Sequence, residues 1–159
     1  MKTKNRKIWL LVLLVIAIPI AWYLISPAFI VVEKNEEFPI QEILENENTK
    51  METKIAFSVV KEAVFLPKAH EVKGKALVIN DNGKLILRFE DFETINGPDL
   101  FIYLSNDLEA KDFVNLGEIK ATKGNVNYDI PNNADLEKYN KILVWCRAFR
   151  VLFSYAELK

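Results

Sequence analysis

The stretch GKALVINDNGKLILRFEDF, residues 74–92, decides the fold class of this chain. An apolar run ends at the Asn82-Gly83 pair, and from Leu85 onward apolar side chains occupy every second position until Asp91 breaks the alternation. Side chains of a strand point alternately to its two faces, and Asn-Gly is a favoured pair in tight hairpin turns. The stretch therefore predicts two strands joined by a short turn.

Short apolar runs separated by turn residues continue from this hairpin to the C-terminus. A Gly-Pro turn precedes the run at 100–105, and further runs follow at 113–119, 125–131 and 141–153. Turn signals at such regular spacing are typical of all-β domains, and no segment here has the pattern of a long helix. We predict an all-β fold for residues 55–159, an antiparallel β-sandwich or jelly-roll-like domain.

The N-terminal segment predicts a membrane span, because the run from Ile8 to Val32 contains no charged side chain. About 20 apolar residues suffice to cross a bilayer as a helix. Basic residues precede the run and acidic residues follow it: Lys2, Lys4, Arg6 and Lys7, then Glu33, Glu36 and Glu37. The positive-inside rule then predicts a single-pass protein of the cell membrane, with residues 1–32 forming a cytoplasmic tip and signal anchor and the β domain extracytoplasmic. The alternative is a signal peptide cleaved after Ala28.

Residues 33–54 are rich in Glu, Asn and Lys and contain few large apolar side chains. Such a segment buries too little apolar surface to offset the entropy lost on ordering. We therefore predict a polar stalk between the membrane anchor and the β domain.

Composition excludes several classes of function. The 159 residues carry 21 basic and 22 acidic side chains, a net charge of -1, so no broad positive field favours nucleic acid as a partner. With one cysteine and one histidine in the chain, neither a structural zinc site nor a blue-copper site can form from one copy.

The single cysteine, Cys146, lies in the apolar run 141–153. If this run is one strand, Trp145, Phe149, Val151 and Phe153 share the face opposite to Cys146, and we expect these four side chains in the core. Two interpretations of Cys146 stay open. A free cysteine in an apolar strand is often an inert buried residue, whereas Arg147 or Arg150 beside the thiol would favour a reactive thiolate.

The single histidine, His70, is the second candidate site residue. A lone histidine is more often a surface or capping residue than a ligand. Together with Cys146 it would supply two axial ligands to a haem, or a base beside a thiolate, if the fold brings the two side chains into contact. No local hydrolase motif surrounds either residue, and the cofactor is left open.

Several segments resemble the DM-thirteen domain, a family labelled electron-transfer DM domain. They are HEVKGKALVI, LRFEDFETINGPDLFIYLS, LGEIKATKGNVNYDIP and VWCRAFRVLFSYAEL, and the resemblance extends from about Phe57 to Leu158. Its most specific parts are the turn Gly97-Pro98-Asp99 and the aromatic stretch around Cys146, although Ser154 stands where many members have glycine. We interpret the turn as structural, with Gly97 adopting a φ that a Cβ would resist.

The resemblance implies a small extracytoplasmic β domain of a family found beside DOMON domains and b-type membrane cytochromes, with Cys146 as the family cysteine. It thus favours a redox or electron-transfer role through Cys146, exercised with a redox partner protein. The alternative is a non-catalytic binding or structural module of the envelope, in which Cys146 is buried and silent.

Overall fold

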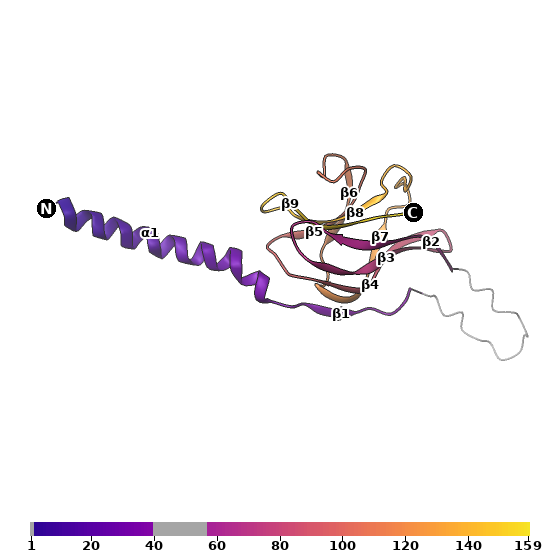
Figure 1. The fold of residues 1–159 in the computed structure, drawn as a ribbon, viewed down its shortest axis with the longest axis horizontal. Helices are drawn as coiled ribbons and strands as arrows, with labels where there is room; N and C mark the ends of the chain where they lie inside the picture. Colours follow the sequence, from indigo (N-terminus) through magenta and orange to yellow (C-terminus); the bar gives the residue numbers. More distant parts are fainter. Residues whose placement is uncertain (1, 40–56) are drawn as a thin grey trace, which may run out of the picture.

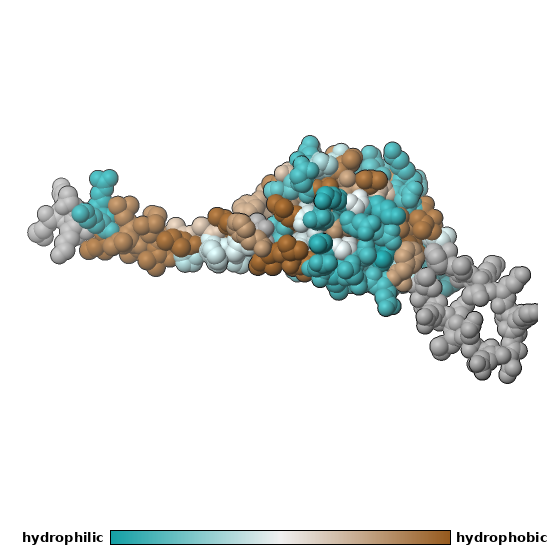
Figure 2. Space-filling model, turned by 60° about the horizontal axis from the view of Figure 1, so that its bottom comes forward, coloured by the Kyte–Doolittle hydropathy of each residue, from teal (hydrophilic) through white to brown (hydrophobic). Residues whose placement is uncertain are grey.

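A long N-terminal helix and a β domain make up the protein in this computed structural model, which describes residues 2–39 and 57–159 (Figure 1). Helix α1 spans Lys2–Ile25 and is followed by the short 3-10 helix η1, Ser26–Phe29. The part of α1 from Arg6 to Ile25 is long and apolar enough to cross a membrane, and none of it is buried within the protein. Figure 2 shows its apolar surface beside the largely polar face of the domain.

Nine strands form one curled sheet in the described parts of the chain. The strands are β1 Glu33–Asn35, β2 Phe57–Pro67, β3 Val72–Asp81, β4 Lys84–Thr94, β5 Leu100–Ser105, β6 Phe113–Glu118, β7 Lys123–Ile130, β8 Lys141–Cys146 and β9 Val151–Glu157. Their order across the sheet is β1-β7-β4-β3-β2-β9-β8-β5-β6. All neighbours are antiparallel except β1 and β7, which are parallel, so the sheet is mixed. The predicted all-β fold is confirmed, although the sheet is mixed and not wholly antiparallel; the sandwich or jelly-roll arrangement stays a prediction.

Strand β2 joins the two halves of the sheet. Its first part, 57–64, pairs with β3, and its end, 65–67, pairs with β9. The two halves curl around one inner core. Its fully buried side chains include Leu87, Phe89 and Tyr128 from one half and Ile102, Ile142 and Val144 from the other.

The Asn-Gly hairpin is confirmed, because Asp81 pairs with Lys84 and both Asn82 and Gly83 have positive φ, 50° and 91°. These are the dihedrals that a tight type I′ turn requires. The break of alternation near Asp91 is a β-bulge. Asp91 itself has φ 50°, and the register between β4 and β7 shifts between Phe89 and Phe92, so both phenylalanines lie in the inner core.

The run 141–153 is not one strand, which corrects the sequence prediction. It forms β8, a four-residue turn at 147–150 and β9, which returns antiparallel to β8. Phe149 lies in the turn and is 52% exposed, so its predicted place in the core is wrong, whereas Phe153 is buried. Val151 is half-buried against the inner core, and Trp145 is half-buried on the opposite face of the sheet.

The first residues of the predicted stalk are part of the sheet, because β1 pairs with the start of β7. Just beyond β1, the guanidinium of Arg88 donates to the carbonyl oxygens of Glu36 and Glu37 at 3.2 and 3.1 Å, and it lies 5.0 Å from the ring centre of Phe38. Arg88 is itself only 5% exposed. The remainder of the predicted stalk, from residue 40 on, lies outside the described residues.

Candidate functional site

Cys146 is the last residue of β8, where it pairs with Leu100 of β5 and Val151 of β9. Its side chain belongs to the inner core and has no exposed surface. The thiol sulfur lies 3.0 Å from the carbonyl oxygen of Pro98, to which the S–H donates. A carbonyl oxygen can only accept a hydrogen bond, so this contact needs the proton on sulfur.

The Gly97-Pro98-Asp99 turn lies against the cysteine and the strand after it. Gly97 does not have a positive φ, which corrects the explanation expected from the sequence; a Cβ there would lie 2.7 Å from the Cζ atom of Phe153. The position therefore requires glycine for space, because real Cβ atoms do not approach so closely. Asp99 is the residue with left-handed backbone, at φ 62°.

Arg147, the residue after the cysteine, is held by Asp99. Its guanidinium donates twice to the carboxylate, at 2.8 and 3.1 Å, and its backbone N–H donates to the Asp99 carbonyl at 3.0 Å. It also lies 3.6 Å from the ring centre of Phe101, a cation-π contact. The hydrogen bond to Asp99 raises the pKa of Arg147. Neither this guanidinium nor that of Arg150 makes a hydrogen bond to the Cys146 thiol.

His70 lies at the same end of the domain but not on the cysteine. Its ring packs against the ring of Phe153, with centres 4.0 Å apart, and its backbone N–H donates to the Phe153 carbonyl at 3.1 Å. Within the described residues, no hydrogen bond joins His70 to Cys146. A haem held by both side chains would require each to leave its present contact, so these contacts do not fit that group, and the haem ligand set stays a prediction.

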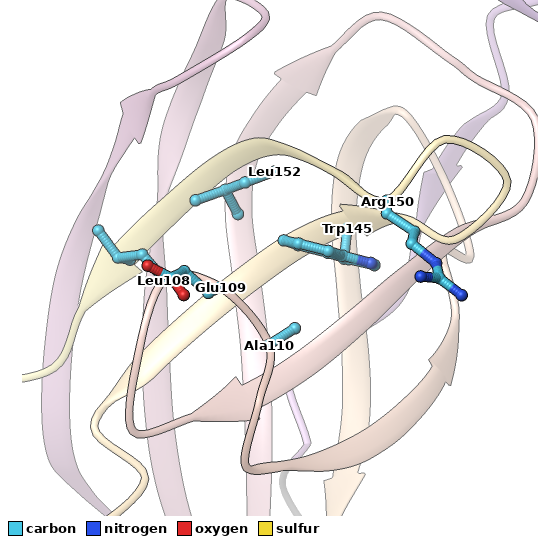
Figure 3. Close-up of a pocket in the computed structure, with 6 residues that line it drawn as sticks. All are labelled: Leu108, Glu109, Ala110, Trp145, Arg150 and Leu152. Atoms are coloured by element: carbon cyan, nitrogen blue, oxygen red, sulfur yellow. The ribbon is translucent and has the colours of Figure 1, made fainter.

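A surface hollow lies on the opposite face of β8, around Trp145. It has a volume of about 580 Å³ and is lined by Leu108, Glu109, Ala110, Trp145, Arg150 and Leu152. Figure 3 shows the indole of Trp145 between Leu152 and Ala110, with Arg150 beside its nitrogen-bearing edge. Beneath it lies a small outer cluster of buried side chains: Phe101, Tyr103, Leu143 and Leu152. The two faces of β8 thus have different surroundings: Trp145 lines the surface hollow, and its neighbour Cys146 lies in the inner core.

No group of three or more potential metal ligands occurs among residues 2–39 and 57–159. The chemically distinctive group in this part of the chain is thus a buried thiol that donates to a backbone carbonyl. The turn Gly97-Pro98-Asp99 lies against it: the Pro98 carbonyl accepts its S–H, and the Asp99 carboxylate binds Arg147, the residue that follows its strand.

A model of the family described as Electron transfer DM13 matches residues 64–158, more than half of the chain. The chain belongs to the DM13 family. This confirms the resemblance noted in the sequence and assigns the domain to an electron-transfer family. The DM13 match leaves out α1, β1 and the first part of β2. Comparisons with curated proteins and with solved structures find no match.

The sequence identified Cys146 and the Gly-Pro-Asp turn of this DM13 domain but not their contact. Pro98 and Cys146 are 48 positions apart, as are Asp99 and Arg147. Strand pairing between β5 and β8 brings them together, and that pairing has no signal in a single sequence. The acid at Asp99 and the base at Arg147 were the one available hint, since opposite charges at the facing ends of paired strands attract.

Proposed function

We propose that this DM13 protein is a single-pass membrane protein whose extracytoplasmic β domain acts in redox chemistry through Cys146, together with a partner protein. The family description supports the redox part. The apolar helix α1 and the basic residues that begin the chain support the anchor and its orientation.

One observation carries the redox proposal: both segments that distinguish the family converge on the thiol. Pro98 provides the oxygen that receives the S–H, Asp99 fixes Arg147, and Gly97 makes room for Phe153. A cysteine that served only to fill space would not need a turn of its own to bind its proton. The turn is therefore both the cover of the thiol and the part that must move for it to react.

The reaction follows from ordinary thiol chemistry. When the turn moves away, Sγ loses its bond to Pro98 and releases its proton to solvent. The resulting thiolate attacks one sulfur of a disulfide on the partner protein, a bond forms between that sulfur and Cys146, and the second partner sulfur leaves as thiolate. The partner disulfide is thereby opened: one of its sulfurs is free as thiolate, and the other is held with Cys146 in a mixed disulfide.

The second candidate is a non-catalytic binding or structural module with a silent cysteine. The complete burial of Cys146 favours it, because an inert free cysteine behaves as a small apolar side chain. The hollow around Trp145 would then be the more useful surface of the domain.

The rate at which the folded full chain reacts with an aromatic disulfide distinguishes the two. The full chain in detergent micelles is treated with 5,5′-dithiobis(2-nitrobenzoate), and the released thiolate is followed by absorbance, with Cys146→Ala as the blank. For a redox cysteine we expect release from the folded chain at a rate limited by opening of the turn, and faster release in Asp99→Asn. Release only after denaturation would reject the redox role and favour the silent module.

Orientation and processing have their own tests. Protease added to intact cells or spheroplasts should digest the β domain if it lies outside the cytoplasm, and protection of the domain would contradict this. The mass of the membrane-bound chain distinguishes a retained anchor from cleavage after Ala28.

An absorption spectrum of the full chain, expressed with haem available, tests the haem prediction. A haem-loaded chain should show a Soret band that shifts in His70→Ala and in Cys146→Ser. Without such a band the haem prediction is rejected, and the thiol chemistry above is unaffected.

A further inference from the structure

The apolar segment that begins in α1 continues up to a residue fixed on the β domain. After the helix ends at Ile25, Phe29, Ile30 and Val31 are all exposed, at 81%, 55% and 71%. Val32 is then bound to Thr122: the Val32 N–H donates to the Thr122 hydroxyl at 3.0 Å, and the Val32 carbonyl accepts the Thr122 N–H at 2.8 Å. No polar spacer therefore separates the membrane segment from the domain.

The length of this connection limits how far the domain can stand from the bilayer. A fully extended chain spans about 3.3–3.6 Å per residue, and the helical turn of η1 shortens the path from Ile25 to Val32 further. Tyr23 of α1 also lines one hollow of about 570 Å³ together with Gly97, Pro98 and Asp99. Tyrosine near the end of a membrane helix commonly lies at headgroup level. The end of the domain that carries Thr122 and the Gly-Pro-Asp turn is thus the end next to the membrane.

Hydrogen bonds and ring contacts show which segments share this end, which we call the proximal end. Thr122 accepts the Thr94 N–H at 2.9 Å, and the Thr94 hydroxyl donates to the carbonyl of Glu71 at 3.1 Å. His70, the residue before Glu71, packs on the ring of Phe153, so the start of β9 lies at this end as well. The turn at 147–150 belongs here too, because it follows Cys146, which pairs with Leu100 next to the Gly-Pro-Asp turn. Figure 1 shows it, in yellow, on the side of the domain that faces α1.

The proximal end exposes apolar side chains that the fold does not need. Phe149 at the tip of its turn is 52% exposed, and Ile95, which follows β4, is 42% exposed. Two cations of this end, Lys68 and Arg150, have no ion-pair partner in the described part of the chain. Five acids of this end are exposed, and three of them are paired: Asp99 with Arg147, Glu33 with Lys123 and Glu93 with Lys73. The other two are Glu71 and Glu118.

We infer that the proximal end rests on the surface of the bilayer that α1 spans. Phe149 and Ile95 lie between the lipid headgroups, where aromatic and aliphatic side chains lose contact with water, and Lys68 and Arg150 bind phosphate groups of phospholipids. The inference rests on the anchor part of the proposed function and is independent of the redox part. Because Cys146 and its turn lie at this end, a partner that reaches the thiol must approach along the membrane surface.

The opposite end of the domain provides the matched control. It carries the Asn82-Gly83 turn, and Asn82 is exposed and polar. This turn joins the end of β3 to the start of β4. Leu85, near the start of β4, pairs with Ile130, the last residue of β7. The first residue of β7, Lys123, lies at the proximal end, so the two ends of β7 mark the two ends of the domain. A reporter at Asn82 therefore lies one strand length away from the proximal end.

Fluorescence of a reporter at the two ends tests the inference in the full chain. Phe149→Cys and Asn82→Cys are each made in a Cys146→Ala background, labelled with nitrobenzoxadiazole and reconstituted into phosphatidylcholine vesicles. A fraction of the lipid carries a nitroxide near the headgroup. We expect blue-shifted emission and strong quenching at position 149, with neither at position 82.

Each other outcome has a defined meaning. Flotation of the vesicles first shows whether the chain is anchored. If the chain floats and position 149 is no more blue-shifted or quenched than position 82, the proximal end stands clear of the bilayer and the inference is wrong, while the anchor stands. If the chain does not float, the anchor fails and the inference fails with it. Neither outcome bears on the redox role, because the labelled chains lack Cys146.

Discussion

The β1 segment, 33–38, and the β8–β9 hairpin, 141–157, are both tied to the sheet, but by different forces. The hairpin contributes fully buried apolar side chains such as Ile142 and Val144 to the inner core. The β1 strand is exposed at every residue and is held by backbone pairing to β7 and by polar contacts. The difference shows that order in this protein does not require burial: a polar segment becomes part of the fold when a sheet edge and a buried guanidinium offer it hydrogen bonds.

The largest expected effect is a difference in stability between two phenylalanine variants of the hairpin, one at a buried position and one at an exposed position. Phe153→Ala should lower the free energy of unfolding by about 3–5 kcal/mol, because it removes a buried ring that packs beside Gly97 and His70. Phe149→Ala, four positions earlier, should change it by less than about 0.5 kcal/mol, because that ring is largely exposed. Urea unfolding followed by tryptophan fluorescence measures both. Similar losses in the two variants would contradict the register described for β9.

A pair of glycine variants then tests the attachment of β1. Gly124 and Gly117 have nearly the same φ, 109° and 108°, so alanine should cost about 1–2 kcal/mol of backbone strain at either position. A Cβ on Gly124 would lie 2.2 Å from the carbonyl oxygen of Lys34, whereas one on Gly117 meets no atom within 4 Å. We therefore expect Gly124→Ala, and not Gly117→Ala, to displace β1.

Hydrogen exchange at the Glu36 amide reads out this displacement. That N–H donates to the Asn125 carbonyl at 2.8 Å, so its protection should fall in Gly124→Ala and be retained in Gly117→Ala. Equal protection in the two variants would mean that β1 is not held by close approach to β7.

The smallest expected effect is a pH dependence confined to β1. Burial raises the pKa of Glu36, but hydrogen bonds from Lys34 and from the Asn127 N–H, at 2.6 and 2.7 Å, outweigh it and leave the pKa below its ordinary value of 4.5. A carboxyl whose pKa is lowered in the folded state stabilises that state above the ordinary pKa and loses this effect as the pH falls through the folded pKa. Protection of the Glu36 amide should therefore decrease below pH 4.5, by less than about 1 kcal/mol because the side chain is partly exposed.

Glu36→Gln isolates the contribution of this carboxyl. The pKa of Glu90, beside Arg88, is lowered as well. Burial raises this pKa, but hydrogen bonds from Lys75 and Arg88 lower it by more than burial raises it. The variant should therefore show a weaker pH dependence and keep the part due to Glu90. An unchanged pH dependence in Glu36→Gln would assign the whole effect to other groups.

Sequence patterns predicted the strands that are held by burial and missed the segment that is not. The hairpin at Asn82 and Gly83 and the run 100–105 are correct because side-chain alternation and turn chemistry are local. The turn at 147–150 was missed because Arg-Ala-Phe-Arg contains none of the usual turn residues, and Arg150 adopts φ 54° against its own preference. Strand β1 was missed because backbone pairing at a sheet edge leaves no pattern in side chains.

The same division applies to the site. Apolar neighbours on both sides favoured burial of Cys146, and the side chain is buried. The hydrogen-bond acceptor of the thiol was not predictable, because it is the backbone oxygen of Pro98, in the connection between β4 and β5. Arg147 was expected near the thiol from adjacency alone, yet the strand ends at Cys146 and Arg147 begins the turn, where its guanidinium contacts Phe101 and Asp99 instead.

The parallel pairing of β1 also protects the sheet from self-association. An uncovered edge strand offers free N–H and C=O groups to the edge of a second copy, and β7 would be such a strand without β1. β1 covers it with three residues, two of them charged, Glu33 and Lys34, which discourage further strand addition. A shortened chain that begins after these residues would retain the whole region matched by the family yet expose the β7 edge. Strand β1 therefore has a second role: it closes the β7 edge of the sheet to strand addition by a second copy.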